Sequence, residues 1–252
     1  MVYGVAPVGE ERAGYGYRGL VVRAGAQAVL ERARALGFTG WVGPQEGPDV
    51  VVVAAGTGLF VADGGRDLED VGAEMARLGP TLLVTVVRDR LLALVLLREV
   101  GDVEDGGDGV EALRYLSEPS VLDPDDDDQP RGEHHAGAMA RAFGVPGVAG
   151  ELRDVLAEAL DPEHYIESER LGRVLALLGL PGWLVSSWTL PRPMSVGPAR
   201  LTRLRAGKTG PAGVVAGWAA ARSRRARQVV SRRPDGPRPD GLGAGPGDDV
   251  LW

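Results

Sequence analysis

Apolar residues recur at helical spacing in two stretches of the first half of the chain. Residues 25–36 and 67–78 place an apolar side chain at every third or fourth position, which predicts two amphipathic helices. Each stretch is followed by a glycine, Gly37 or Gly79, where a helix C-terminal cap is expected. Asp67 is expected to cap the start of the second helix.

Short runs of β-branched and other apolar residues surround both helices and predict strands. After each helix the order strand, turn, strand recurs, with the two copies about 42 residues apart. Residues 50–55 and 59–62 are expected to pair as a hairpin, and residues 43–49 to form the turn before it. The expected strands are residues 2–8, 19–23, 38–42, 50–55, 59–62, 81–87 and 91–98, with 110–116 at an edge.

These elements predict an α+β fold in which a mainly antiparallel sheet carries two helices on one face. The recurrence of helix, strand, turn and strand has two explanations. It is either a duplicated helix–hairpin unit or a coincidental likeness between short α/β units, and the sequence leaves both open.

The second half of the chain is expected to be helical after an acidic linker that contains the run Asp125–Asp128. The predicted division is an α+β domain at 1–120, the linker at 121–133, a small helical part at 134–192, and a basic, largely disordered tail at 193–252. Two apolar stripes define the helical part: Leu152, Val155, Leu156 and Ala159, and then Leu171, Val174, Leu175 and Leu178.

Charge is divided unevenly along the chain, and the formal net charge of −7 conceals the division. Residues 1–197 hold 17 basic and 31 acidic side chains, whereas residues 198–233 hold 10 basic side chains and no acidic one. This division predicts an acidic folded body followed by a basic tail, a common form of interaction tail. The tail arginines expected to contact nucleic acid or an anionic surface are Arg222, Arg224, Arg225, Arg227, Arg232 and Arg233.

Composition excludes several kinds of chemistry. The chain has no cysteine, which excludes disulfides, thiolate metal sites and cysteine nucleophiles. The N-terminal residues lack the pattern of a signal peptide, and no apolar run approaches the ~18 residues of a membrane span, so a cytoplasmic protein is expected. Lys208 is the only lysine beside 27 arginines, a bias that indicates a GC-rich coding sequence.

Two glycine-containing motifs have a chemical interpretation and a structural one. Gly207-Lys208-Thr209 resembles the end of a phosphate-binding loop, but Thr202 stands where that loop needs its first glycine. The paired glycines in residues 61–66 could surround an anion with backbone N–H groups, although such a pair more often forms a tight turn. The structural interpretation is favoured for both motifs.

Other polar groups lack the spacing that their chemistry needs. His134 and His135 follow the acidic run, but the ligand order of a calcium loop is absent and a solvated linker is favoured. We therefore assign no catalytic residue, no cofactor and no metal site. The remaining groups considered are His164 with Glu167, the serines Ser186, Ser187 and Ser195, and the loop carboxylates Asp102, Glu104, Asp105 and Asp108.

Four segments resemble proteins of unknown activity that are common in actinobacteria. The segments are LGFTGWVGP (36–44), VADGGRDLEDV (61–71), RYLSEPS (114–120) and IESERLGRVLALLGLPGW (166–183). The resemblance covers most of residues 25–190 and leaves the basic tail outside. It implies an actinobacterial source and one continuous folded unit, and it carries no functional residue to this chain.

The leading functional interpretation is a non-enzymatic protein that binds another protein, as an adaptor or a toxin-neutralising protein does. It depends on the charge division, because an acidic body would meet a basic partner surface. Two alternatives stay open. One is association with nucleic acid or an anionic surface through the tail, and the other is an enzyme whose site is assembled from residues distant in sequence.

Overall fold

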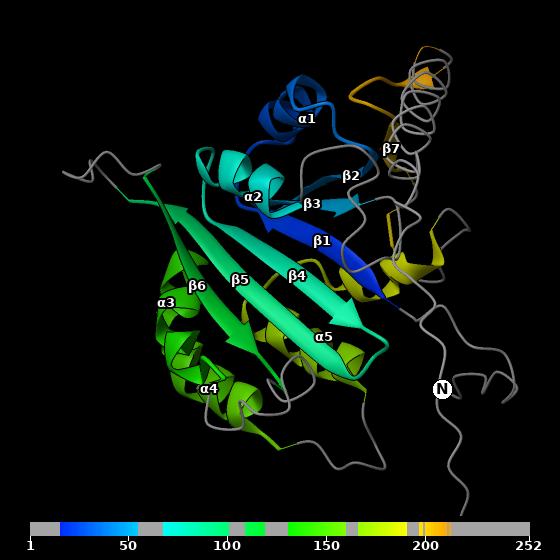
Figure 1. The fold of residues 1–252 in the computed structure, drawn as a ribbon. Helices are drawn as coiled ribbons and strands as arrows, with labels where there is room; N and C mark the ends of the chain where they lie inside the picture. Colours follow the sequence, from blue (N-terminus) through cyan, green and yellow to red (C-terminus); the bar gives the residue numbers. More distant parts are fainter. Residues whose placement is uncertain are drawn as a thin grey trace, which may run out of the picture.

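Seven strands form one sheet in the order β6-β5-β4-β1-β3-β2-β7, and every neighbouring pair is antiparallel (Figure 1). The computed structural model describes residues 16–54, 68–100, 109–118, 131–159, 166–190, 197–198, 200–210 and 212. The predicted α+β class with a mainly antiparallel sheet is confirmed. The strands are β1 (Tyr17–Val22), β2 (Gly40–Glu46), β3 (Asp49–Ala54), β4 (Thr81–Val87), β5 (Leu91–Glu99), β6 (Val110–Leu116) and β7 (Thr202–Leu204).

β1 lies at the centre of the sheet, between β3 and β4. Successive side chains of a strand point to opposite faces, and both faces of β1 are apolar. Leu20 and Val22 enter one hydrophobic core, whereas Tyr17 and Val21 enter the other. A sheet with two apolar faces has to be covered on both, and the helices of the chain are divided accordingly.

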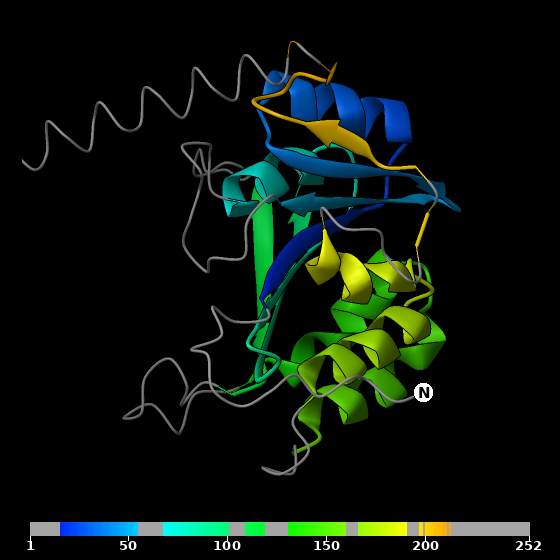
Figure 2. The same cartoon turned by 90° about the vertical axis from the view of Figure 1, so that its right-hand side faces the viewer.

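Helices lie on opposite sides of the sheet (Figure 2). The two helices from the first half of the chain pack on the Leu20 side, as their apolar stripes indicate, and the helices from the second half pack on the Tyr17 side. We call these the α1/α2 core and the α3–α5 core. The helices are α1 (Ala26–Ala35), α2 (Leu68–Ala76), α3 (Ala136–Ala142), α4 (Ala149–Ala157) and α5 (Glu167–Leu177), with 3-10 turns η2 (Glu133–His135), η3 (Pro146–Val148) and η4 (Gly182–Thr189).

The predicted stripes of the second half face the α3–α5 core. All four apolar residues of the 171–178 stripe are buried, and so are the first three of the 152–159 stripe. Ala159 is exposed, because α4 ends at Ala157. These side chains share one core with β1, β4 and β5, so the helical part packs directly on the sheet.

The predicted hairpin between residues 50–55 and 59–62 is wrong. β3 has β1 on one side and β2 on the other, so both of its hydrogen-bonding edges are occupied. Its hairpin partner is β2, which continues to Glu46, and the turn contracts to Gly47 and Pro48. The register shifts between Val42 and Gln45, which lets the Gly43-Pro44 pair remain inside the strand. Residues 59–62, like the expected strand at 2–8 and the expected cap Asp67, lie outside the described residues.

The order helix, strand, turn, strand does recur, as α1-β2-β3 and as α2-β4-β5. The two hairpins join β1 differently. The first is attached through its second strand, β3, and the second through its first strand, β4. Duplication therefore stays a prediction.

β7 lies within the segment predicted to be a largely disordered tail, and residues 200–210 of that segment form an ordered strand and turn. β7 pairs with β2 through Gly40–Leu204, Trp41–Arg203 and Val42–Thr202. The Leu204 side chain is fully buried in the α1/α2 core. The free edge of β2 and one buried leucine thus order a segment whose composition resembles that of a disordered chain.

Gly207 provides a test of how firmly this segment is attached. Its φ of 74° is left-handed, and an added Cβ would lie 2.3 Å from the Arg34 carbonyl oxygen at the end of α1. Gly210 has a similar φ of 59°, but open space surrounds it. Gly210→Ala should cost about 1–2 kcal/mol of the free energy of unfolding, the cost of a left-handed alanine. Gly207→Ala should cost about 1–3 kcal/mol more, because the backbone has to move. Urea denaturation measures both, and equal losses would contradict the docking of this turn.

Candidate functional site

The arginines that the sequence singled out are not placed by the structure. Arg222, Arg224, Arg225, Arg227, Arg232 and Arg233 all lie outside the described residues. The segment that leads to them is placed, however, because it forms β7 and the turn that follows. β7 and its turn therefore hold the first part of the basic segment.

The turn after β7 is held tightly against the α1–β2 connection. Arg205 and Lys208 exchange backbone hydrogen bonds of 2.9 and 3.1 Å, with Ala206 and Gly207 both at positive φ. The Gly207 N–H donates to the Phe38 carbonyl, and the Ala206 N–H donates to the Thr39 hydroxyl at 2.9 Å. The phosphate-loop likeness of residues 207–209 is thus a tight β-turn, in agreement with the interpretation favoured from the sequence.

Cationic residues lie along β7 and near its turn at this edge of the sheet, on both faces. The Arg203 guanidinium lies over the Trp41 ring, 5.4 Å from its centroid. Arg34 belongs to the last turn of α1, and its backbone carbonyl oxygen lies close to Gly207. Within the described part of the chain, none of these cations forms an ion pair. We call the group the β7 basic patch, and it comprises Arg34, Arg200, Arg203, Arg205 and Lys208.

The described residues do not account for the protein's negative charge. The described residues between 16 and 190 hold 14 basic and 16 acidic side chains, a net charge of −2. Over all described residues the counts are 18 basic and 16 acidic, a net charge of +2, against −7 for the whole chain. The excess carboxylates therefore fall outside the described residues, and the expectation of an acidic folded body stays a prediction.

His134 and His135 lie in η2, at the start of α3. Their ring centroids are 3.9 Å apart, and burial together with the neighbouring His134 lowers the pKa of His135. Among the residues that the structure places, no cluster of three or more metal-ligating side chains occurs. The acidic run Asp125–Asp128 and His164 are not among those residues, and neither are Ser195, the 61–66 glycines or the carboxylates of 102–108.

The strongest polar feature inside the molecule is a charged pair on α5 that the sequence did not reveal. Glu167 and Arg170 are only 1% and 3% exposed. The Arg170 Nε and the Glu167 Oε2 atoms are 3.6 Å apart, and neither atom has a hydrogen-bond partner. Arg170 donates instead to the Tyr115 hydroxyl at 2.8 Å and to the Glu158 carbonyl at 2.5 Å. Tyr115 in turn donates to the Leu156 carbonyl at 2.8 Å.

This pair could have been found in the apolar stripe itself. Glu167 and Arg170 precede Leu171 and Val174 by four residues each, so they occupy the buried face of α5. Glu169 and Arg173 are spaced for an ion pair on the exposed face of α5, but Arg173 pairs with Glu158 at 2.5 Å. The charged residues at core-facing positions of α5 are the feature of the sequence that indicates a buried pair.

The β4–β5 turn anchors the start of α5. Asp89 in this turn has a φ of 56°, and its Oδ1 accepts hydrogen bonds from the Ser168 N–H at 2.7 Å and the Ser168 hydroxyl at 2.6 Å. The Tyr17 hydroxyl lies 3.1 Å from the same Ser168 hydroxyl, and burial raises the pKa of Tyr17 far above its usual range. Burial also raises the pKa of Tyr115 to about 12. Both phenols therefore remain protonated donors at neutral pH and hold the helical layer on the sheet.

Two of the candidate serines, Ser186 and Ser187, lie in η4. Ser187 lies in η4 with its hydroxyl buried and without a hydrogen-bond partner in the described structure. The described part of the chain contains no helix long and apolar enough to cross a bilayer.

Comparison of the chain with known protein families, with characterised proteins and with solved structures gives no match. The comparisons therefore add no family and no activity. The functional proposal rests on the geometry of the chain itself.

Glu167 predicts a specific pH dependence of stability. Burial raises the pKa of this carboxyl, against the lowering effects of the Ser117 hydroxyl and of Arg170. The folded protein therefore binds this proton more tightly than the unfolded chain does. The resulting stability is fully present below the unfolded pKa of about 4.5 and is lost as the pH rises through the folded pKa.

The wild type should lose stability relative to Glu167→Gln as the pH rises above about 4.5. The free energy of unfolding should fall by about 1.4 kcal/mol for each pH unit that separates the unfolded from the folded pKa of Glu167. Urea denaturation at several pH values measures this difference. Glu169→Gln, an exposed change two positions along the same helix, is the matched control. Parallel pH profiles of wild type and Glu167→Gln would contradict the assignment.

Proposed function

We propose that this protein is a binding protein whose β7 basic patch, together with the arginines that follow it in the chain, contacts the phosphates of a nucleic acid. The observation that carries the proposal is the patch itself. It holds five cations around one folded edge, without an acidic partner among the residues that the structure describes. Arginine and lysine groups of this kind contact phosphate oxygens in a way that does not depend on base sequence.

The patch and the tail form a continuous basic segment. Residues 198–233 hold 10 basic side chains and no carboxylate, and the first four of these cations lie on β7, before it or in its turn. The backbone bonds at Ala206 and Gly207 fix where this segment leaves the sheet. A partner anchored at the patch would therefore meet the remaining six arginines, Arg222 to Arg233, in the adjoining chain.

The charge of the described body also favours an anionic partner over a basic one. An adaptor that binds a basic protein needs a negative folded surface, but the described residues carry a net charge of +2. The protein-binding interpretation stays a prediction, because the excess carboxylates on which it depends lie outside the described residues. Binding of an anionic membrane surface uses the same cations, so it becomes an outcome that the experiment has to separate.

Two charge-neutralising variants test the proposal. Arg203→Gln with Lys208→Gln removes two exposed cations from the patch, and Arg90→Gln with Arg153→Gln removes two exposed cations from other parts of the surface. Mobility shift with mixed DNA and RNA probes should show binding that falls steeply with salt. The patch variant should reduce the slope of log K against log salt by about 2, since each phosphate contact contributes about 0.9.

The control variant should leave that slope unchanged. Equal slopes for both variants, or no shift by the wild type at low salt, would contradict the proposal. Binding of phosphatidylserine vesicles without any shift of nucleic acid would replace it with a membrane-surface function. A chain ending at Ser195 is a poor test, because it would also remove β7 from the sheet. A chain ending at residue 212 keeps β7 and removes the six tail arginines together with Arg238 and four aspartates.

A further inference from the structure

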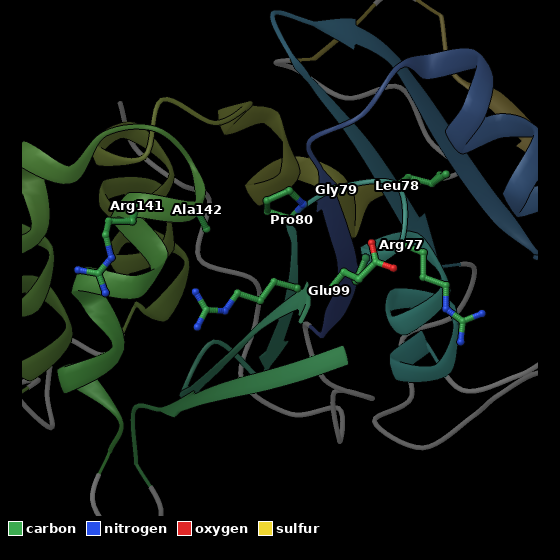
Figure 3. A pocket seen from close by; sticks show the side chains of 9 residues that line it. Arg77, Leu78, Gly79, Pro80, Glu99, Arg141 and Ala142 are labelled. Atoms are coloured by element: carbon green, nitrogen blue, oxygen red, sulfur yellow. The ribbon is translucent and has the colours of Figure 1, made fainter. Parts of the chain in front are cut away.

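A groove of about 590 Å³ lies at the end of the sheet opposite the β4–β5 turn. Its wall comes from three parts of the chain: the connection from α2 to β4, the end of β5, and the end of α3. Figure 3 shows Arg141 and Ala142 of α3 on one side, with Gly79 and Pro80 between them and Arg77. The lining residues are Ala76, Arg77, Leu78, Gly79, Pro80, Arg98, Glu99, Arg141 and Ala142.

The floor of the groove is held by backbone contacts. The Arg23 N–H donates to the Pro80 carbonyl at 3.0 Å, and the Thr81 hydroxyl donates to the Gly79 carbonyl at 3.0 Å. A Cβ on Gly79 would lie 2.2 Å from the Arg23 carbonyl oxygen, so the two segments are in close contact. Two carbonyl oxygens that would otherwise repel an anion are thus already occupied by donors.

The arginines of the groove differ in whether they already form an ion pair with a neighbouring carboxylate. The Arg77 Nη1 lies 3.4 Å from Glu74, and Figure 3 shows its side chain directed away from Arg141. Arg98 uses its Nε for Glu111 at 2.5 Å, and its two terminal nitrogens have no partner among the described residues. Arg141 is exposed and forms no ion pair within the described part of the chain.

We propose that this groove binds a small organic phosphate, with the phosphate between Arg98 and Arg141. Arg141 and the two terminal nitrogens of Arg98 have no partner among the described residues, so they supply the donors for a phosphate, whereas Arg77 is paired with Glu74. The apolar side chains of Ala76, Leu78, Pro80 and Ala142 leave a surface for an uncharged organic part, and the volume is that of a small-molecule site. This site lies apart from β7 and does not depend on the proposed nucleic-acid binding.

Isothermal titration calorimetry with adenosine monophosphate, inorganic phosphate and adenosine tests the proposal on the full chain. Adenosine monophosphate should bind most tightly, because it alone supplies both the dianion and an organic part. Arg141→Gln should weaken its binding about tenfold or more, the loss expected for one charge-assisted contact. Arg153→Gln, an exposed change on α4 outside the groove, should leave the affinity unchanged.

Glu99→Gln separates an anion site from other polar sites, because removing a carboxylate should tighten the binding of a phosphate. Weaker binding by this variant would overturn the proposal in favour of a ligand with a cationic group. Failure of adenosine monophosphate to bind the wild type at millimolar concentration would also overturn it, as would equal effects of Arg141→Gln and Arg153→Gln. The Arg203→Gln with Lys208→Gln variant should keep its affinity for adenosine monophosphate, and a loss there would assign the binding to the β7 basic patch instead.

Discussion

The central constraint on this structure is that the sheet is apolar on both faces. β1 sends alternate side chains into two separate cores, and β4 and β5 do the same. One helical layer would leave the other face in water, at a cost of about 25 cal/mol for each Å² of apolar surface. The second half of the chain therefore has to dock, although the order of elements in the first half already resembles a complete domain. This need explains why the contacts of α5 are so polar. They fix the first turn of a helix that is distant from the sheet in sequence, where Ser168 contacts Asp89 and Tyr17 and Arg170 donates to Tyr115.

Local patterns in the sequence predicted most of the helices and strands. The errors concern contacts between segments that are distant in sequence. The strand at 81–87 and the edge strand at 110–116 have the expected bounds, because a run of apolar residues between turns is a local property. The hairpin partner of β3 was wrong, since pairing is decided by which edge is free after the sheet assembles. β7 was missed because its three residues contain one apolar side chain, Leu204, whose burial depends on a pocket formed by α1 and β2.

The candidate site likewise combines features that the sequence predicts with contacts that exist only in the folded chain. The charge pattern located the basic segment, but of the 35 carboxylates only 16 belong to residues that the structure describes. The described residues are instead close to neutral, with a net charge of +2. Arg34 joins the patch only because α1 ends beside the turn at Gly207, a contact between residues more than 170 positions apart in sequence. The groove at the other end of the sheet likewise joins α2, β5 and α3, and no linear motif records it.

The turn after β7 has a chemical consequence that follows from a single residue. Lys208 is the only lysine in the chain, and it is exposed in that turn, so it is the only side chain with a primary amine. Acylation at this position would remove one cation from the patch and would leave every arginine charged. An amine-reactive dye used above neutral pH would join the protein at Lys208 or at the chain's α-amino group. The molecule therefore offers one side-chain position at which amine chemistry can both report on the patch and lower its charge.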